Sequence, residues 1–398
     1  MDLSFGDALL IFGALLAVAA ALSGLTHGTV LSISVLAVAI GVALAAADVV
    51  SVNPGDPGLV ELIELALVLT LFADGLAAER ELLWVHWGPV TRAIVLTMPL
   101  TLVLLGLAAH TLIGGLGWSQ AFLLAAVLTP TDPVVTSTIV TSRRVPALVR
   151  HTLNLESGLN DGIAVPFVLF FLTLAGASGG AGTAAAKLIG EAAFGAVVGA
   201  VLGVAAGRLH HRLPGGGIAR RYEGIYAVGF GLAAFGLADV TIGNGFIAAF
   251  VCGLAMGAAE HEIPAAFGEF AENVSAISQV ITFFVFGALI YTTGYGGEVW
   301  QLAIFVVLAL VVARPIAIAL SFVRARFPRP QLAFIAWFGP KGVASMLFAL
   351  FVLDSHAPDR SIIFSAAAFT VIASIVAHGL TDTLGAHWIE RRMEASDG

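Results

Sequence analysis

The stretch Leu128-Thr-Pro-Thr-Asp-Pro133 interrupts an apolar run that extends from residue 121 to residue 140. A proline inside a helix removes one backbone hydrogen bond and clashes with the preceding turn. Two prolines here bracket Thr131 and Asp132, so the sequence predicts a helix that is broken in the middle of a membrane. Such backbone is tolerated at bilayer depth only where it is buried in protein or lines water.

A second stretch, Glu156-Ser-Gly-Leu-Asn-Asp161, puts more acid into an apolar segment. Ser157 and Asp161 are four residues apart and share one helix face, and Glu156 and Asn160 share the adjoining face. A lone buried acid can neutralise an arginine or cap a helix. Acids in a membrane segment are costly, however, and by default they indicate an ion or proton pathway. Asp132 and Asp161 together are therefore the predicted site.

The composition predicts a polytopic membrane protein. The 398 residues are 59% hydrophobic and 11% charged, whereas soluble domains carry about 25% charged residues. A formal net charge of -8 offers no basic surface for nucleic acid. The single cysteine, Cys252, excludes a disulfide framework and a cysteine-based metal site, and no cofactor is expected. The first apolar run has no basic region or cleavage signal and is predicted to be a retained helix.

About twenty apolar residues span a bilayer, and this criterion predicts thirteen transmembrane helices in one all-α unit over residues 1–398, without a soluble regulatory domain. The expected spans are 7–25, 29–47, 58–77, 91–113, 120–141, 148–176, 184–207, 222–239, 242–259, 271–292, 299–321, 331–353 and 361–384.

Basic residues indicate how the chain is oriented in the membrane. With the N-terminus outside, fourteen of the eighteen Lys and Arg residues fall in inner loops or the C-terminal tail, and two fall outside. Because cytoplasmic loops carry an excess of Lys and Arg, we expect an external N-terminus and a cytoplasmic C-terminus in the cell (inner) membrane.

The twelfth span is interrupted as well, at Gly339-Pro-Lys-Gly342, which sets Lys341 at the break. Seven spans separate it from the fifth, so the two broken helices run in opposite directions. Paired interrupted helices in inverted halves mark the binding site of many transporters. We therefore expect crossed discontinuous helices in two inverted-topology repeats, 7–176 and 222–384, with a linking helix at 184–207.

Carboxylates, a hydroxyl and freed carbonyls form a hard-oxygen site suited to a small cation such as Na⁺. An acid that binds either a proton or a cation, and not both at once, is sufficient for exchange, and neighbouring acids titrate as a unit. Glu156 is expected to pair with a buried cation, first Arg314 and otherwise Lys341. Asp74 is expected to line the cytoplasmic approach. No role is assigned to His27, His86, His151 or His378.

These motifs resemble those of the monovalent cation/proton antiporters, in particular the bacterial and archaeal Na⁺/H⁺ antiporters related to animal sodium/proton exchangers. The resemblance rests on five motifs in matching order: Thr131-Asp-Pro133, Glu156-Ser with Asn160-Asp161, Ala313-Arg314, Gly339-Pro-Lys-Gly342 and Phe72-Ala-Asp-Gly75.

The resemblance implies Thr131, Asp132, Ser157 and Asp161 as ligands of Na⁺, Asn160 as the site-organising amide, and Glu156 with Arg314 as a structural ion pair. It also implies a homodimer, an elevator-like movement of a six-helix core, and a role in pH homeostasis. The Asn-Asp pair is typical of electroneutral exchange. Two departures are Lys341, where the family usually has arginine, and Asp74, where it often has glutamate. Lysine, unlike arginine, can lose its proton when buried.

Three readings remain beside exchange of Na⁺ or Li⁺ for H⁺. K⁺/H⁺ or non-selective monovalent cation/H⁺ exchange depends on site dimensions that the sequence does not fix. A channel needs no acid that also titrates. An intramembrane aspartyl protease would use paired aspartates, but the motifs of those enzymes differ from Thr-Asp-Pro and Leu-Asn-Asp. We therefore expect a transporter and not an enzyme.

Overall fold

The computed structural model describes residues 5–26, 33–54, 56–77, 87–132, 142, 144–176, 181–210, 218–259, 265–325 and 327–397. The regular elements in these ranges are helices, with no strand among them. The first half contains α1 (Phe5–Thr26), α2 (Ile33–Ala46), α3 (Pro57–Ala77), α5 (Trp87–Arg92), η1 (Ala93–Thr97), α6 (Met98–Leu112), α7 (Trp118–Leu128) and α9 (Ala147–Gly176). The remainder contains α10 (Ala181–His210), α11 (Arg220–Asp239), α12 (Gly245–Ala259), α13 (Ala265–Thr293), α14 (Val299–Val307), η3 (Leu308–Ala313), α15 (Arg314–Ser321), α16 (Arg329–Trp337), α17 (Val343–Asp354) and α18 (Arg360–Asp397).

These helices agree with the predicted apolar spans, with two notable differences. The helix of the fifth span, α7, ends at Leu128, and residues 133–141 of that span lie outside the described residues. The last helix continues to Asp397, beyond the expected end at residue 384, because residues such as Ala, Glu, Arg and Met in its tail favour helix. Six helices of the described chain are long and apolar enough to cross a membrane, so the number of crossings stays a prediction.

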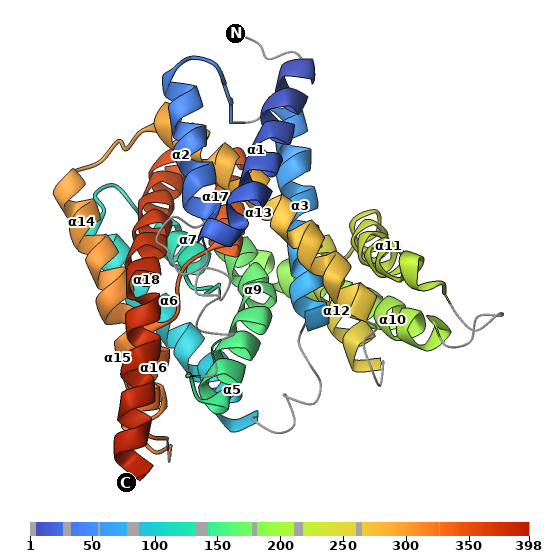
Figure 1. The fold of residues 1–398 in the computed structure, drawn as a ribbon. Helices are drawn as coiled ribbons and strands as arrows, with labels where there is room; N and C mark the ends of the chain where they lie inside the picture. The colour runs from blue at the N-terminus through green and yellow to red at the C-terminus, as the bar shows by residue number, and fades with distance from the viewer. Residues whose placement is uncertain are drawn as a thin grey trace.

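The helices form one bundle, with α10, α11 and α12 toward one side and α14, α15 and α18 toward the other (Figure 1). Helices α7, α9 and α17 lie between these groups and contact one another. The end of α18 lies opposite the end of the molecule where α1 begins (Figure 1).

Two helices contain a π-helical turn directly before a proline. The turn η1 precedes Pro99 of α6, and η3 precedes Pro315 of α15. Proline cannot donate to the helix ladder and crowds the preceding turn, and a π-bulge is one way in which a helix accommodates such a disruption. These two composite helices pack against each other, because α6 contacts α14, η3 and α15.

Reciprocal glycines allow two helix pairs to approach closely. A Cβ atom on Gly41 of α2 would lie 2.2 Å from Phe284 O of α13, and one on Gly287 of α13 would lie 2.2 Å from Val38 O of α2. Helices in membranes associate through small residues of this kind, which let backbones touch.

Helices α3 and α12 meet in the same way. A Cβ atom on Gly75 would lie 2.3 Å from Phe250 O, and one on Gly253 would lie 2.2 Å from Phe72 O. Gly41 and Gly253 are 212 residues apart in sequence, as are Gly75 and Gly287.

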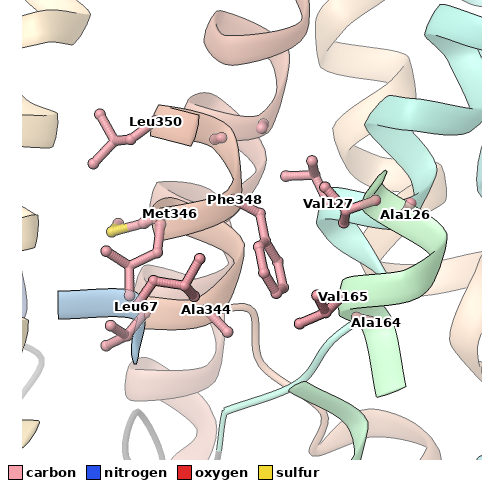
Figure 2. Close-up of a cluster of buried hydrophobic side chains, with 14 of the residues drawn as sticks. Leu67, Ala126, Val127, Ala164, Val165, Ala344, Met346, Phe348 and Leu350 are labelled. Atoms are coloured by element: carbon pink, nitrogen blue, oxygen red, sulfur yellow. The ribbon is translucent and has the colours of Figure 1, made fainter. Parts of the chain in front are cut away.

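The apolar core surrounds α17. Figure 2 shows Phe348 of α17 pointing toward Val127 of α7 and Val165 of α9, while Met346 lies on the side of Leu67 from α3; all five side chains are buried. Protein interiors are close-packed, so α17 is held firmly just after its N-terminal end, where the polar residues described next are found.

Candidate functional site

Two interruptions of the helical backbone lie next to each other in the middle of the fold. The fifth-span break, Thr129–Asp132, follows α7, and the Thr129 hydroxyl donates to Ala125 O at 2.7 Å. The twelfth-span break, Phe338–Gly342, separates α16 from α17. The break that the sequence predicts in the twelfth span is therefore confirmed, and so is the loss of helix before Asp132 in the fifth.

Asp132 joins the two breaks. Its backbone N–H donates to Pro340 O at 2.8 Å, and its carboxylate oxygen Oδ2 accepts the Val343 N–H at 3.0 Å. Val343 is the first residue of α17, so the carboxylate lies at a helix N-terminus, where negative charge is stabilised. A Cβ atom on Gly342 would lie 2.1 Å from that oxygen, so only glycine fits at this close approach.

Lys341 of the twelfth-span break makes a reciprocal contact with the fifth-span break. Its ammonium nitrogen Nζ donates to Thr129 O at 3.3 Å and to Pro130 O at 3.2 Å, and the side chain is 2% exposed. Both carbonyls lie in the fifth-span break, where the helix no longer supplies them with donors. A buried cation thus compensates the unwound carbonyls.

Helix α9 fixes the rest of the fifth-span break through Thr131. The Ser157 hydroxyl donates to Thr131 O, and the Asn160 amide Nδ2 donates to Thr131 Oγ1 at 2.8 Å. All three side chains are buried. The spacing of Ser157 and Asn160 within one helical turn brings both onto the same unwound residue.

Asp161 follows on α9 and is hydrogen-bonded, side chain to side chain, to Asp74 of α3. A hydrogen bond between two carboxyl groups needs a shared proton. In the described structure, Asp161 Oδ1, Asp74 Oδ2 and Asn160 Oδ1 are buried oxygens without a hydrogen-bond partner. Asp132 is close enough to interact electrostatically with both aspartates.

Buried oxygens without a hydrogen-bond partner are rare in proteins and are often found where a water molecule or an ion binds. The described residues contain no group of three or more His, Cys, Asp and Glu side chains arranged to hold a metal ion. A cation here would therefore need hydroxyl, amide and carbonyl oxygens in addition to carboxylates, which is the ligand chemistry of hard monovalent and divalent ions.

Glu156 points to a different partner. Arg314 binds it through both terminal nitrogens, with Nη1 at 2.7 Å from Oε1 and Nη2 at 3.0 Å from Oε2. The guanidinium also donates to Ile335 O at 3.3 Å, and both side chains are buried. A Cβ atom on Gly339 would lie 2.1 Å from Arg314 Nε. The pair thus braces α9, α15 and α16 against one another.

Two sets of contacts at the site were not predicted from the sequence, one made by Asp74 and the other by Ser374 and His378. Asp74 was expected to line an approach path, whereas it contacts Asp161 directly. Ser374 and His378 of α18 contact the twelfth-span break, although no role was assigned to them. Their spacing of four residues places both on one helix face, but apolar neighbours conceal that signal in the sequence.

Buried carboxyl groups beside two interrupted helices, inside an apolar helical bundle, are typical of membrane transporters. The chain belongs to the sodium/hydrogen exchanger transmembrane family, whose model matches residues 8–384. The protein is therefore a multi-pass membrane protein of the monovalent cation/proton antiporters, which are secondary transporters and not enzymes.

Individual relatives are more distant. The chain is 27% identical over 340 residues to a K⁺/H⁺ antiporter NhaP from Alkalimonas amylolytica, covering 84% of this chain and 58% of that protein. It is 26% identical over 374 residues to the Na⁺/H⁺ antiporter 2 of Zygosaccharomyces rouxii, covering 81% and 45%. The chain thus spans about half the length of these curated relatives.

The fold has a solved counterpart. The sodium proton antiporter MjNhaP1 from Methanocaldococcus jannaschii superimposes with a TM-score of 0.80 at 18% identity, covering 96% of this chain and 98% of the other. The predicted all-helical antiporter fold is confirmed at this level.

Proposed function

We propose that the protein exchanges Na⁺ or Li⁺ for H⁺ across a cell membrane, with Asp161 as the acid that carries either ion. The observation that carries this proposal is the buried Asp161 carboxyl group, which has one oxygen without a partner and a hydrogen bond to a second acid, Asp74. A proton satisfies this pair in one state. A cation that displaces the proton satisfies it in the other.

The cation ligands are the oxygens of Thr131, Asp132, Ser157 and Asp161. Support comes from their convergence on the fifth-span break, where Ser157 and Asn160 already hold Thr131. Asn160 organises the site by fixing the Thr131 hydroxyl. Asp74, which the sequence analysis assigned to the approach path, then receives or passes the proton beside Asp161.

Exchange is electroneutral. The family resemblance supports this through the Asn160-Asp161 pair, in which a neutral amide stands beside the acid, and Glu156 on the same helix is neutralised by Arg314. One cation therefore replaces one proton. If this is so, the rate of exchange in vesicles does not respond to a membrane potential imposed with K⁺ and valinomycin.

Alternating access follows from two inverted repeats, 7–176 and 222–384, with thirteen crossings and crossed fifth and twelfth helices. Three paired features support this symmetry: the two breaks, the two π-turns before a proline, and the two reciprocal glycine contacts with their shared offset of 212 residues. The breaks and the π-turns each occur once in each repeat, and each glycine contact joins a helix of the first repeat to a helix of the second. The Lys and Arg distribution supports an external N-terminus and a cytoplasmic C-terminus. The family resemblance supports a homodimer.

K⁺/H⁺ exchange is the second candidate, and the A. amylolytica relative, a K⁺/H⁺ antiporter, favours it. The two candidates use the same acids and differ in the size of the cation that the oxygens fit. Selectivity between Na⁺ and K⁺ differs among the relatives, which include both kinds of antiporter.

The test is collapse of a preformed proton gradient in proteoliposomes on addition of Na⁺, Li⁺ or K⁺, with Asp161→Asn beside the wild type. A Na⁺ or Li⁺ response that is lost in the variant supports the proposal. A response to K⁺ alone supports the second candidate. No response to any cation from acid to alkaline pH, or full turnover in Asp161→Asn, contradicts the assigned mechanism.

A further inference from the structure

Two side chains of α18 contact the twelfth-span break from the side away from Asp132. Ser374 is 0% exposed and His378 is 1% exposed. The imidazole nitrogen Nε2 of His378 lies 2.9 Å from Trp337 O, and Ser374 Oγ accepts a hydrogen bond from the Lys341 backbone N–H at 2.8 Å. The helix is interrupted here, so the Lys341 N–H donates to a side chain, and the Trp337 carbonyl accepts the Gly339 N–H at 2.9 Å in place of a helical donor.

The His378 ring also packs against the two aromatic residues at the start of the break, Trp337 and Phe338. Its centroid lies 5.3 Å from that of Trp337 and 6.3 Å from that of Phe338. The indole nitrogen of Trp337 donates to Thr381 Oγ1 at 2.9 Å, and Thr381 lies on α18 three residues after His378. The end of α16 is therefore fixed to α18 by both packing and hydrogen bonds.

One peptide group connects these contacts to the site. The N–H of Lys341 and the carbonyl of Pro340 belong to the same planar peptide unit. Ser374 accepts from its N–H, and the backbone N–H of Asp132 donates to its carbonyl at 2.8 Å. Since the unit is rigid, the position of Ser374 determines where Asp132 finds its acceptor.

We propose that Ser374 and His378 are positioning residues for ion exchange, which hold the Pro340–Lys341 peptide and thereby orient Asp132. This proposal rests on the function proposed above. Ser374 acts directly on the peptide. His378 acts through Ser374 and through the Trp337 carbonyl.

The hydrogen-bond order around Ser374 depends on whether His378 carries a second proton. When the ring is neutral with its proton on Nε2, Nδ1 accepts from the Ser374 hydroxyl, 3.2 Å away. When both nitrogens carry protons, Nδ1 donates to Ser374 O at 2.7 Å, and the hydroxyl loses its acceptor. Ser374 then holds the Lys341 N–H differently in the two states.

Charged groups of other elements face this ring. In the described part of the chain, Lys341 and Arg314 interact with it electrostatically, and Arg314 is itself paired with Glu156. Asp382 follows one helical turn later on α18. A change in the charge of His378 therefore acts first at the twelfth-span break and reaches Asp132 through the Pro340–Lys341 peptide.

The test compares four variants with the wild type in proteoliposomes: Ser374→Ala, Ser374→Thr, His378→Gln and His110→Gln. His110 is a matched control, because its ring is also bonded to a carbonyl, Leu116 O at 3.0 Å, and stacked on Trp118 at 3.8 Å, but lies away from the break. Cation KM, maximal rate and the pH profile are measured for each.

Ser374→Ala leaves the Lys341 N–H unsatisfied and is expected to raise the cation KM about tenfold, while Ser374→Thr keeps the hydroxyl and the wild-type KM. His378→Gln keeps a donor for Trp337 O but cannot gain a proton, so it is expected to retain the alkaline rate and change the acidic limb of the pH profile. His110→Gln is expected to leave both unchanged.

An unchanged KM in folded Ser374→Ala, or a wild-type pH profile in His378→Gln, overturns the proposal; if Ser374→Ala does not fold, His378→Gln decides. If the wild type exchanges no cation, the proposed function fails and the structural part is tested by backbone hydrogen exchange over residues 337–343. Faster hydrogen exchange in Ser374→Ala or His378→Gln than in His110→Gln then supports positioning, and equal hydrogen exchange contradicts it.

Discussion

The two breaks differ in which backbone groups they expose, and each is completed by a charged side chain from the other. The fifth-span break presents carbonyls, and Lys341 of the twelfth-span break donates to two of them. The twelfth-span break presents the amide of Val343, and Asp132 of the fifth-span break accepts from it. The end of one helix is negative and the beginning of the other positive, so each attracts the opposite charge.

The two breaks differ in the polar groups that lie beside them in addition to these reciprocal contacts. At the twelfth-span break, Ser374 and His378 of α18 bond the remaining backbone groups, Lys341 N–H and Trp337 O, and neither side chain is an acid. The fifth-span break instead adjoins Asp161 and Asp74, which retain oxygens without partners. This comparison supports the proposal that the twelfth-span break is a fixed support and that the fifth-span break is the face on which ions bind.

The largest expected effect is that of Asp132→Asn. The amide oxygen can still accept from Val343, so the contact between the breaks persists, but the charge that binds a cation is gone. We expect exchange to be abolished in a protein that elutes and melts as the wild type does. Full turnover in vesicles would show that Asp132 serves only as a helix cap.

Glu156→Gln comes next, because it removes one member of a buried ion pair. Leaving Arg314 without its partner is expected to cost about 3–5 kcal/mol of stability. Thermal unfolding in detergent measures this loss, and cation KM in the surviving folded fraction serves as the second readout. A wild-type melting temperature with lost cation affinity would make Glu156 a ligand and not a brace.

Lys341→Ala tests the support of the fifth-span break. Two buried carbonyls lose their donor, at about 1–3 kcal/mol for each unsatisfied group. We expect a lower melting temperature and slower exchange, measured in parallel. Lys341→Arg is the control, because it keeps the positive charge and is expected to retain exchange; a folded but inactive arginine variant would contradict this role.

Gly342→Ala has the smallest expected effect of the four. Its Cβ atom would meet Asp132 Oδ2 at 2.1 Å, so the breaks must move apart, and overpacking of this kind costs about 1–3 kcal/mol. Gly229→Ala on α11 is the control, since nothing lies within 4 Å of its Cβ position. That change is expected to raise stability by about 0.4–1 kcal/mol. Equal melting temperatures for the two variants would contradict the close approach.

The sequence predicted those parts of the site that local chemistry determines. Pro130 and Pro340, each close to a glycine or to a second proline, remove backbone hydrogen bonds and thereby favour an interruption of the helix. Glu156 and Arg314 are charged residues in apolar surroundings, and burial of a charge requires a partner. Apart from the C-terminal ends of α7 and α18, the apolar spans also predicted the helices to within about six residues. These features depend on a residue and its neighbours along the chain.

Contacts between distant elements were harder to predict. Asp74 contacts Asp161 because α3 packs against α9, where the Cβ position of Gly158 lies only 3.5 Å from Asp74 O, and no local pattern encodes that distance. His378 resembles any isolated histidine until α16 is known to end beside it. The polar residues of a membrane bundle acquire their meaning from partners on other helices.

Proton release on cation binding tests the central claim most directly. Na⁺, Li⁺ or K⁺ is added to the detergent-solubilised protein in weak buffer, and the pH change is compared between the wild type and Asp161→Asn. The account predicts about one proton released for each cation bound by the wild type, and none released by the variant. Cation binding without proton release, or equal release by the variant, would contradict the claim that one buried carboxyl group carries both ions.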